Sequence, residues 1–390
     1  MDLKNMREQI DGIDEQIVSL FKNRMRIVHD VAEYKRLNNL PVLHTDREQQ
    51  VLDRVAAMAT DPVTGDDLSD YVRFLFTTIM DLSKTQQNND LTADTRLSRT
   101  IHQALEDGRT LPVAPVVACQ GVDGAYSSMA ARGMFSDGKL RFYQDFSDIF
   151  ESVKRGECDI GVLPIENSTA GSVNNVYDLM KKYQFHIVRG YRLEVRHCLL
   201  AKPGVHFDDI TDVYSHTQAI SQCHDFLQAH PNIRVHLYSN TAAAARFVSE
   251  CGDRGVAAIA SRECADIYRL NVVLDEIKDA KRNYTRFIAI SNKMLITEDA
   301  NRMSVALTLP HEAGSLYKLI TQFAMLELNL TKLESRPLPD TNFEFLFYFD
   351  FTGNAANEHI IKLLTRLEQQ CDYFAFLGNY RELDSSGAIS

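Results

Sequence analysis

Residues 6–35 read MREQIDGIDEQIVSLFKNRMRIVHDVAEYK, and this stretch decides the fold of the N-terminal part of the chain. Its apolar residues recur at intervals of three, four and seven, the spacing of one helix face; they are Met6, Ile10, Ile13, Ile17, Leu20, Phe21, Val28 and Val31. The pattern holds over 2–37, which predicts a helix of about 50 Å. An ordinary small domain does not cover so long a helix, so we expect a dimer in which a partner chain covers it. Similar patterns predict helices over 46–59 and 68–87.

Three cations lie on or beside this apolar stripe, where apolar residues are expected. They are Arg7, Arg24 and Lys35. Because an unpaired buried charge is costly, they need anionic partners. Arginine binds carboxylates in a bidentate way, and lysine can donate to an ether oxygen. A buried pocket lined by such groups would suit a small dianion.

The other two predicted helices add polar residues to their own apolar stripes. Glu48 and His44 extend the second stripe, and Gln86 ends the third. Two other interpretations stay open. The cations could reach solvent or pair with Glu48 at the surface of the bundle, and Thr45-x-x-Glu48 is also a capping box, which would explain Glu48 without a ligand.

The quoted stretch, TDRE at 45–48 and SKTQQ at 83–87 resemble the all-helical chorismate mutases, over nearly all of 3–87. That family binds chorismate in a dimer of long helices and rearranges it to prephenate. The resemblance implies these substrate-binding positions: Arg7, Arg24, Lys35, His44, Arg47, Glu48 and Gln86. By the same resemblance, Arg7 reaches the pocket of the partner chain.

The rearrangement is intramolecular, so it needs no cofactor, metal or nucleophile. Lys35 and Gln86 are the expected catalytic donors to the ether oxygen, where charge develops. The three arginines would hold carboxylates, and Glu48 would orient the ring hydroxyl.

Two positions depart from that family. Many relatives carry Asp where this chain has His44, and some carry Ser where it has Leu82. His44 can still donate a hydrogen bond, whereas Leu82 cannot, and Ser83 is expected to be one residue off the correct face. We expect an active mutase with altered contacts; the alternative is a helical segment that only dimerises.

The rest of the chain predicts further domains. Residues 88–112 are a polar linker with one short helix near 97–105. Residues 113–291 alternate short apolar runs with amphipathic helices, which indicates an α/β domain. Residues 300–383 show the order strand, helix, strand, strand, helix, strand, which is typical of a ferredoxin-like α+β domain. Together with an all-helical domain at 1–87, this makes a multidomain protein.

Polar strings follow the strand-like runs of the α/β domain, at the sheet edge where ligands bind. Any one string is more typical of a helix cap or a turn, but six together favour a cleft that suits carboxylates. The strings are 120–131, 163–180, 196–200, 214–219, 239–245 and 283–287.

PIEN at 164–167, the stretch after it and TRF at 285–287 resemble prephenate dehydratases, over about 114–291. That family has two α/β lobes around a cleft, like bacterial solute-binding proteins, and it converts prephenate to phenylpyruvate by expelling the ring hydroxyl and CO₂. The essential threonine of the family matches Thr285, which we expect to be a hydrogen-bond donor to the departing hydroxyl. The expected cleft residues are Asn167, Ser168, Thr169, Ser215, His216, Gln218, Asn240 and Thr241. Arg286 could bind a substrate carboxylate or form a structural ion pair, and both readings stay open.

The C-terminal strings LPHEAGSLYKLI (309–320) and LESRPLP (333–339) resemble the ACT domain that follows prephenate dehydratases and binds phenylalanine at a dimer interface. The resemblance implies an effector site made of Gly314, Ser315, Leu316, Glu334, Ser335 and Arg336. The alternative is a module that only dimerises.

Composition narrows the class of protein. Lys and Arg number 42 and Asp and Glu 53, a net charge of −11 that argues against nucleic-acid binding. No apolar run is long enough to span a membrane. The 7 cysteines include no CxxC pair, which indicates a reducing cytoplasm and no zinc site.

We therefore expect a cytoplasmic, homo-oligomeric enzyme of phenylalanine biosynthesis. It would act on chorismate and prephenate, use no cofactor or metal, and be inhibited by L-phenylalanine. The alternatives are a dehydratase without mutase activity, a preference for the aminated substrate arogenate, and a non-catalytic ligand sensor.

Overall fold

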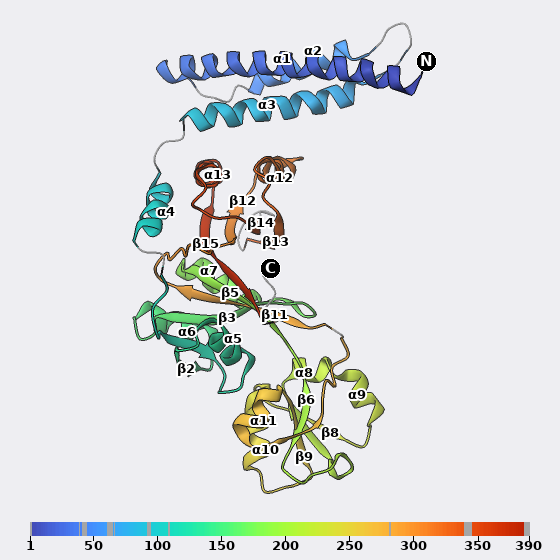
Figure 1. The fold of residues 1–390 in the computed structure, drawn as a ribbon, viewed down its shortest axis with the longest axis vertical. Helices are drawn as coiled ribbons and strands as arrows, with labels where there is room; N and C mark the ends of the chain where they lie inside the picture. Colours follow the sequence, from blue (N-terminus) through green and yellow to red (C-terminus); the bar gives the residue numbers. More distant parts are fainter. Residues whose placement is uncertain are drawn as a thin grey trace. The chain divides into compact units, whose positions relative to one another are not determined.

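The computed structural model describes residues 2–38, 40, 45–60, 65, 67–91, 95–107, 110–280, 282–338 and 345–385. The chain divides into two compact units (Figure 1). One comprises Met1–Arg99, Pro310–Gln322 and Ile361–Gln370, and the other comprises Thr100–Leu309, Phe323–Ile360 and Cys371–Ser390. Within the described part of the chain, no helix combines the length and the apolar character that crossing a membrane requires.

The first unit holds the three predicted N-terminal helices: α1 (Leu3–Leu37), α2 (Thr45–Met58) and α3 (Ser69–Leu91). The long helix is therefore confirmed, with 35 residues. Among its described residues only Ala32 is buried, and most of its apolar stripe is exposed, Leu20 to 69%. The described part of the chain leaves this face largely uncovered, and the dimer stays a prediction.

The second unit begins with α4 (Arg96–Glu106), most of which belongs to it and which confirms the short helix in the linker. The first α/β lobe follows, with strand order β5-β11-β3-β1-β2. Its strands are β1 (Val116–Gln120), β2 (Lys139–Tyr143), β3 (Ile160–Asn167), β4 (Gly171–Ser172), β5 (His186–Glu194) and β11 (Tyr284–Ser291). Its helices are α5 (Tyr126–Met134), α6 (Phe146–Lys154) and α7 (Asn174–Tyr183).

The second lobe is inserted between β5 and β11, and its strand order is β10-β6-β9-β7-β8. Its strands are β6 (Cys198–Ala201), β7 (Asp212–Ser215), β8 (Arg234–Leu237), β9 (Val256–Ala260) and β10 (Asn271–Leu274). Its helices are α8 (Thr217–Ser221), α9 (His224–Ala229), α10 (Thr241–Glu250) and α11 (Arg262–Tyr268), with a 3₁₀ turn at Phe207–Asp209. Side chains alternate along β9, so that Ala258 packs toward α10 and Ile259 toward α8. The expected two-lobed α/β domain is present.

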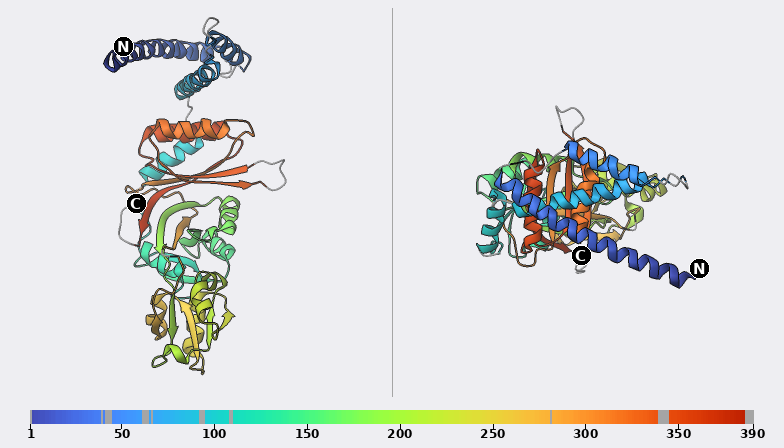
Figure 2. Two further views of the ribbon diagram at one scale, coloured as in Figure 1. Left: turned by 90° about the vertical axis from the view of Figure 1, so that its right-hand side faces the viewer. Right: turned by 90° about the horizontal axis from the view of Figure 1, so that it is seen from above.

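The C-terminal module has the predicted order of elements: β12 (Arg302–Thr308), α12 (Ser315–Met325), β13 (Leu330–Pro337), β14 (Phe345–Thr352), α13 (Glu358–Gln370) and β15 (Phe374–Asp384). The strands of the module lie in the order β13-β14-β12-β15, as in a ferredoxin-like sheet. Figure 2 shows β13 and β14 side by side as a long antiparallel pair.

One strand joins the module to the first lobe. The sequence pattern predicts a last strand over 373–377, but β15 continues to Asp384. Its first part pairs with β12, and Arg381–Asp384 pair in parallel with β5, so the two sheets become one. Backbone pairing extended this strand, a long-range effect that local sequence does not report.

Gly378 marks the point where β15 approaches β5. Its φ is +150°, and a Cβ there would lie 2.2 Å from the carbonyl oxygen of Ile187. A backbone atom cannot move away from the added Cβ in the way that the end of a flexible side chain can. Only glycine fits this position.

We therefore expect Gly378→Ala to lower the free energy of unfolding of the second unit by about 2–4 kcal/mol, the sum of overpacking and backbone strain. Urea unfolding followed by circular dichroism would measure it. Gly252→Ala is the matched control, since a Cβ there meets nothing within 4 Å. Equal stability of the two variants would show that β15 does not approach β5 in this way.

Candidate active sites

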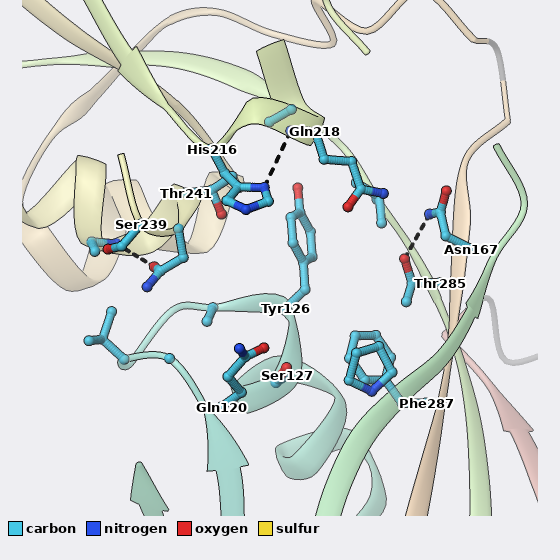
Figure 3. Close-up of a pocket in the computed structure, with 18 of the residues that line it drawn as sticks. Gln120, Tyr126, Ser127, Asn167, His216, Gln218, Ser239, Thr241, Thr285 and Phe287 are labelled. Atoms are coloured by element: carbon cyan, nitrogen blue, oxygen red, sulfur yellow. Dashed lines mark hydrogen bonds between the residues drawn. The ribbon is translucent and has the colours of Figure 1, made fainter. Parts of the chain in front are cut away.

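A cavity of about 740 Å³ lies within the second unit, lined by residues of both α/β lobes (Figure 3). Its wall comes from the ends of β1, β3, β7 and β8, the starts of α5, α8 and α10, and one end of β11. The lining residues used below are Ala125, Tyr126, Ser127, Asp145, Asn167, His197, His216, Gln218, Gln222, Asn240, Thr241 and Thr285.

Thr285 receives a hydrogen bond from Asn167. The Asn167 amide nitrogen Nδ2 donates to Thr285 Oγ1 at 2.9 Å and to Asn283 Oδ1 at 2.9 Å. Its oxygen accepts from the backbone and hydroxyl of Thr169, at 3.0 and 2.7 Å. The donors on one side and the acceptors on the other fix which way the amide points. Since Thr285 Oγ1 accepts from Asn167, the Thr285 O–H remains available to donate into the cavity.

A second set of hydrogen bonds braces Thr169. Gln222 Nε2 donates to Thr169 Oγ1 at 2.9 Å, and Gln222 Oε1 lies 3.0 Å from His197 Nε2. Burial lowers the pKa of His197 to about 4, so the ring is neutral at pH 7 and Nε2 carries the proton that Gln222 accepts. His197 Nδ1 lies 3.2 Å from the Tyr126 hydroxyl. This side of the cavity is thus a rigid, neutral network.

The charge of the cavity wall is small. Among the described residues that line it, Asp145 is the one carboxylate, and none is Arg or Lys. An anion in this cavity must therefore bind to neutral donors: hydroxyls, amides and the backbone N–H groups at helix starts.

The helical unit contains a separate polar cluster. Arg24 donates to the hydroxyl of Ser83, which is buried and itself donates to the carbonyl of Ile79 at 2.7 Å. Burial lowers the pKa of Arg24, but an arginine stays charged at pH 7. The Arg24 guanidinium faces α3, and no carboxylate of α3 bonds it among the described residues.

Glu48 pairs with a lysine that the sequence pattern did not single out. Lys84 Nζ lies 3.2 Å from Glu48 and 2.8 Å from Asp81. Burial lowers the pKa of Lys84, but the two carboxylates raise it by more, so its net shift is upward. Neither Arg24 nor Lys35 neutralises Glu48 in these pairs.

Comparison with known proteins covers both regions. Residues 117–295 match the prephenate dehydratase family, and residues 6–88 match chorismate mutase type II. The chain is 35% identical over 312 residues to arogenate dehydratase/prephenate dehydratase 2 of Arabidopsis thaliana, covering 77% of this chain and 81% of that protein. It is 28% identical to the bifunctional chorismate mutase/prephenate dehydratase of Escherichia coli, over 96% of this chain and 95% of that protein.

The chain belongs to the bifunctional chorismate mutase/prephenate dehydratases. It is thus an enzyme of phenylalanine biosynthesis with an isomerase and a lyase region. A solved structure also resembles it: the prephenate dehydratase of Arthrobacter aurescens in complex with L-Phe. The TM-score is 0.62 at 28% identity, covering 70% of this chain and 92% of that one.

The structure corrects one prediction in the mutase region of this bifunctional enzyme. Ser83 was expected to be off the inward face, but it is buried and bonds Arg24, while Leu82 is only half-buried. The inward stripe of α3 runs through Met80, Ser83 and Gln87, one residue out of phase with the predicted stripe. Leu82 therefore gives no reason to doubt the mutase.

The same phase shift affects the predicted glutamine. Gln86 is half-buried, whereas Gln87 is buried and its Oε1 has no partner among the described residues. Arg7 and Arg47 are exposed, and His44 lies outside the described residues. Arg7 and Arg24 lie 17 residues apart on one helix, roughly 25 Å, so a single chain does not bring them together.

In the dehydratase region the structure brings together six of the predicted residues at the cavity: Asn167, His216, Gln218, Asn240, Thr241 and Thr285. Three others are not among the residues that line the cavity: Ser168 and Thr169 are exposed, and Ser215 is buried. Thr169 donates to Asn167, Ser168 accepts from the backbone N–H of Tyr284, and Ser215 donates to the carbonyl of Ile259 at 2.6 Å.

Arg286 does not face the cavity. It follows Thr285 on β11, so its side chain points to the opposite face of the sheet. It is buried between Asp350 and Glu382 and also bonds the Tyr380 hydroxyl at 2.7 Å. The structural ion pair is the correct reading of this residue, and the substrate-binding reading is wrong.

Part of the predicted effector stretch bonds the first lobe. Glu334 accepts from the hydroxyl of Ser172, and Lys332 lies 3.0 Å from both Glu334 and Glu166. Arg336 pairs with Asp178 at 2.9 Å. Glu166, which takes part in these contacts, directly precedes Asn167 on β3. Ser335 is exposed on β13 between Glu334 and Arg336. The other predicted effector residues, Gly314, Ser315 and Leu316, stand at the start of α12.

Tyr126, Ser127 and Gln222 line the cavity but were not among the predicted cleft residues, although Tyr126 and Ser127 fall in the string 120–131. Gln222 lies between two short helices, and no spacing links it to Asn167. His197 falls in the string 196–200; burial raises the pKa of the Cys198 thiol beside it to about 12, which leaves that thiol inert.

His197 makes stability depend on pH. The unfolded chain takes up a proton on this residue near pH 6.5, whereas the folded chain does so only near pH 4. Acid therefore favours the unfolded state over this interval. We expect the free energy of unfolding of the wild type to fall by about 2 kcal/mol from His197 alone between pH 7 and pH 5. His197→Gln should flatten that part of the profile in urea titrations, and an unchanged slope would contradict it.

Proposed function

We propose that this chain carries out two consecutive reactions at two separate sites. The helical unit rearranges chorismate to prephenate, and the cavity between the α/β lobes converts prephenate to phenylpyruvate. The observation that carries the proposal is the cavity with Thr285 at its wall, its hydroxyl aimed by Asn167. Seven free cysteines, each a thiol in the structure, support a cytoplasmic location.

In the mutase site the donors would hold the reactive conformer of chorismate. Arg24 is a buried cation held by Ser83, which suits a substrate carboxylate. We propose Lys35 and Gln87, rather than Gln86, as donors to the ether oxygen, because Gln87 lies on the inward face of α3. Glu48, held by Lys84, would accept from the ring hydroxyl. The developing charge at the oxygen is then met by fixed donors.

A second copy of the chain would complete that site. The exposed apolar stripe of α1 needs cover, and Arg7 is too far along the helix to reach Arg24 in one chain. An antiparallel partner helix would cover the stripe and bring its own Arg7 to the site. The resemblance to the helical mutases supports the same arrangement.

In the dehydratase site the ring carboxylate leaves as CO₂. Its bonding electrons enter the ring and expel the hydroxyl, and the ring becomes aromatic. The hydroxyl must gain a proton to leave as water, and Thr285 O–H would donate a hydrogen bond to it. The neighbour of Thr285 is an amide, not an acid, so Thr285 stabilises the departing oxygen and the proton comes from solvent. Aromatisation supplies the driving force.

The C-terminal module would be an ACT domain that binds phenylalanine and inhibits the dehydratase. The resemblance of GSLY and ESRP to that domain supports this, as does the likeness to the Arthrobacter aurescens dehydratase that binds L-Phe. The contacts of Lys332 and Glu334 with Glu166 and Ser172 offer a route to Asn167.

Single substitutions should separate the two activities. Arg24→Ala should lower kcat/KM for chorismate by about 100-fold, the loss of a charge-assisted carboxylate contact, and leave prephenate turnover intact. Thr285→Ala should lower kcat for prephenate by about 100- to 1000-fold and leave the mutase intact, because a donor to the departing oxygen is lost. Chorismate, prephenate and phenylpyruvate would be followed by chromatography, with arogenate as a second substrate.

Thr285→Ser keeps the hydroxyl and serves as the matched control. It should retain much of the activity. The two-site proposal fails if either alanine variant loses both activities while its circular dichroism spectrum matches the wild type. A wild type that leaves chorismate untouched and still consumes prephenate would limit the helical unit to dimerisation.

Complementation tests the shared mutase site. Arg7→Ala and Arg24→Ala should each be nearly inactive alone. When equal amounts are refolded together, about half of the dimers are mixed, and each mixed dimer has one intact site. We expect about a quarter of the wild-type mutase activity to return. No return of activity would mean that each site is built from one chain.

A further inference from the structure

The first turn of α5 presents an unsatisfied hydroxyl to the dehydratase cavity. Ser127 lines the cavity and is 8% exposed. Its hydroxyl has no hydrogen-bond partner among the residues that the structure describes, although neighbouring Ser128 bonds the carbonyl of Ala125 at 2.8 Å. The side chain is more than nine-tenths buried, and it lines the cavity, so its hydroxyl is open to a ligand there.

The backbone beside Ser127 is also open. Ala125 is the N-cap residue of α5, and its methyl group cannot cap. The first backbone N–H groups of an α-helix have no partner inside the helix. Those of Tyr126 and Ser127 find none elsewhere in the described part of the chain. Two N–H donors and one hydroxyl therefore meet at one point of the wall.

The other helix starts at the cavity are already occupied. Asn240 caps α10 through Ala243 N at 2.7 Å, and His216 caps the short α8 through Gln218 N at 3.3 Å. The N-cap residue of α6 is Asp145, a carboxylate that would repel another. In the described cavity wall, α5 is the helix start that is both uncapped and free of a carboxylate.

We propose that the start of α5, with Ser127, binds the side-chain carboxylate of the substrate, the carboxylate of its 2-oxo acid arm. Helix N-termini favour anions through their N–H groups and their dipole. A cavity wall without Arg or Lys leaves such neutral donors to do the binding. The inference rests on the proposed dehydratase function.

The chemistry decides between the two carboxylates of prephenate. The ring carboxylate loses its charge when it leaves as CO₂. Donors fixed on it would stabilise the ground state more than the transition state and slow the reaction. The side-chain carboxylate keeps its charge throughout and is retained in phenylpyruvate. Donors there bind substrate and transition state equally, which improves binding without slowing the reaction.

Ser127→Ala tests the proposal in the full-length enzyme. We expect KM for prephenate to rise about 10- to 100-fold with kcat nearly unchanged, since a hydrogen bond to a charged group is lost equally in both states. The inhibition constant of phenylpyruvate should rise by the same factor, because phenylpyruvate keeps only the side-chain carboxylate. An unchanged kcat itself reports that the dehydratase unit is folded.

Ala125→Asp is a second variant, and it is expected to stabilise the fold. An aspartate at this N-cap position would accept the open N–H groups and stabilise α5. It should nevertheless raise KM, because its carboxylate takes the place of that of the substrate. A role limited to folding would lower KM or leave it unchanged. Ser128→Ala is the matched control, since Ser128 faces the carbonyl of Ala125.

The outcomes separate the inference from the function on which it rests. A wild type that does not convert prephenate would refute the proposed function itself. An active wild type with unchanged KM in Ser127→Ala would overturn the inference alone. A raised KM with an unchanged inhibition constant for phenylpyruvate would assign Ser127 to the ring carboxylate and overturn it as well.

Discussion

The orientation of one side-chain amide, that of Asn167, governs the dehydratase site. Its nitrogen contacts Thr285 and Asn283, and its oxygen receives the two N–H groups and the hydroxyl of the turn that follows β3. The amide nitrogen faces acceptors and the amide oxygen faces donors. Turning the amide by 180° would therefore break all of these hydrogen bonds at once. Thr285 Oγ1 thereby acts as the acceptor toward Asn167, and its O–H remains available to a ligand in the cavity.

The strand that carries Thr285 is held from its other face by charge. Arg286 points away from the cavity into Glu382 and Asp350, and both carboxylates are almost completely buried. Breaking such a pair by removing one partner leaves an uncompensated charge, which is far more costly than the pair itself. Neighbouring residues of one strand thus face two ways, Thr285 toward the cavity and Arg286 toward the C-terminal module.

The sequence predicted element types well and side-chain partners poorly. The 35-residue helix, the alternating α/β segment and the βαββαβ order all followed from periodicity, which local residues determine. Ser83 and Gln87 were misplaced because a phase error of one residue on α3 is invisible without its packing partner. Gln222 could not be predicted, since its link to Asn167 joins segments more than fifty residues apart. The extension of β15 depended on a free edge of β5 that no local pattern reveals.

That extension has a consequence for how the enzyme is made. The outer edge of β5 receives its partner, Arg381–Asp384, from a segment that is synthesised long after β5 itself. Until then the growing polypeptide carries an open strand edge beside an almost finished lobe, and Arg286 lacks Glu382. The dehydratase sheet is therefore completed only after the last strand of the C-terminal module has been made. A chain cut just before Arg381 would keep every predicted dehydratase residue, but the strand beneath them would lose its support.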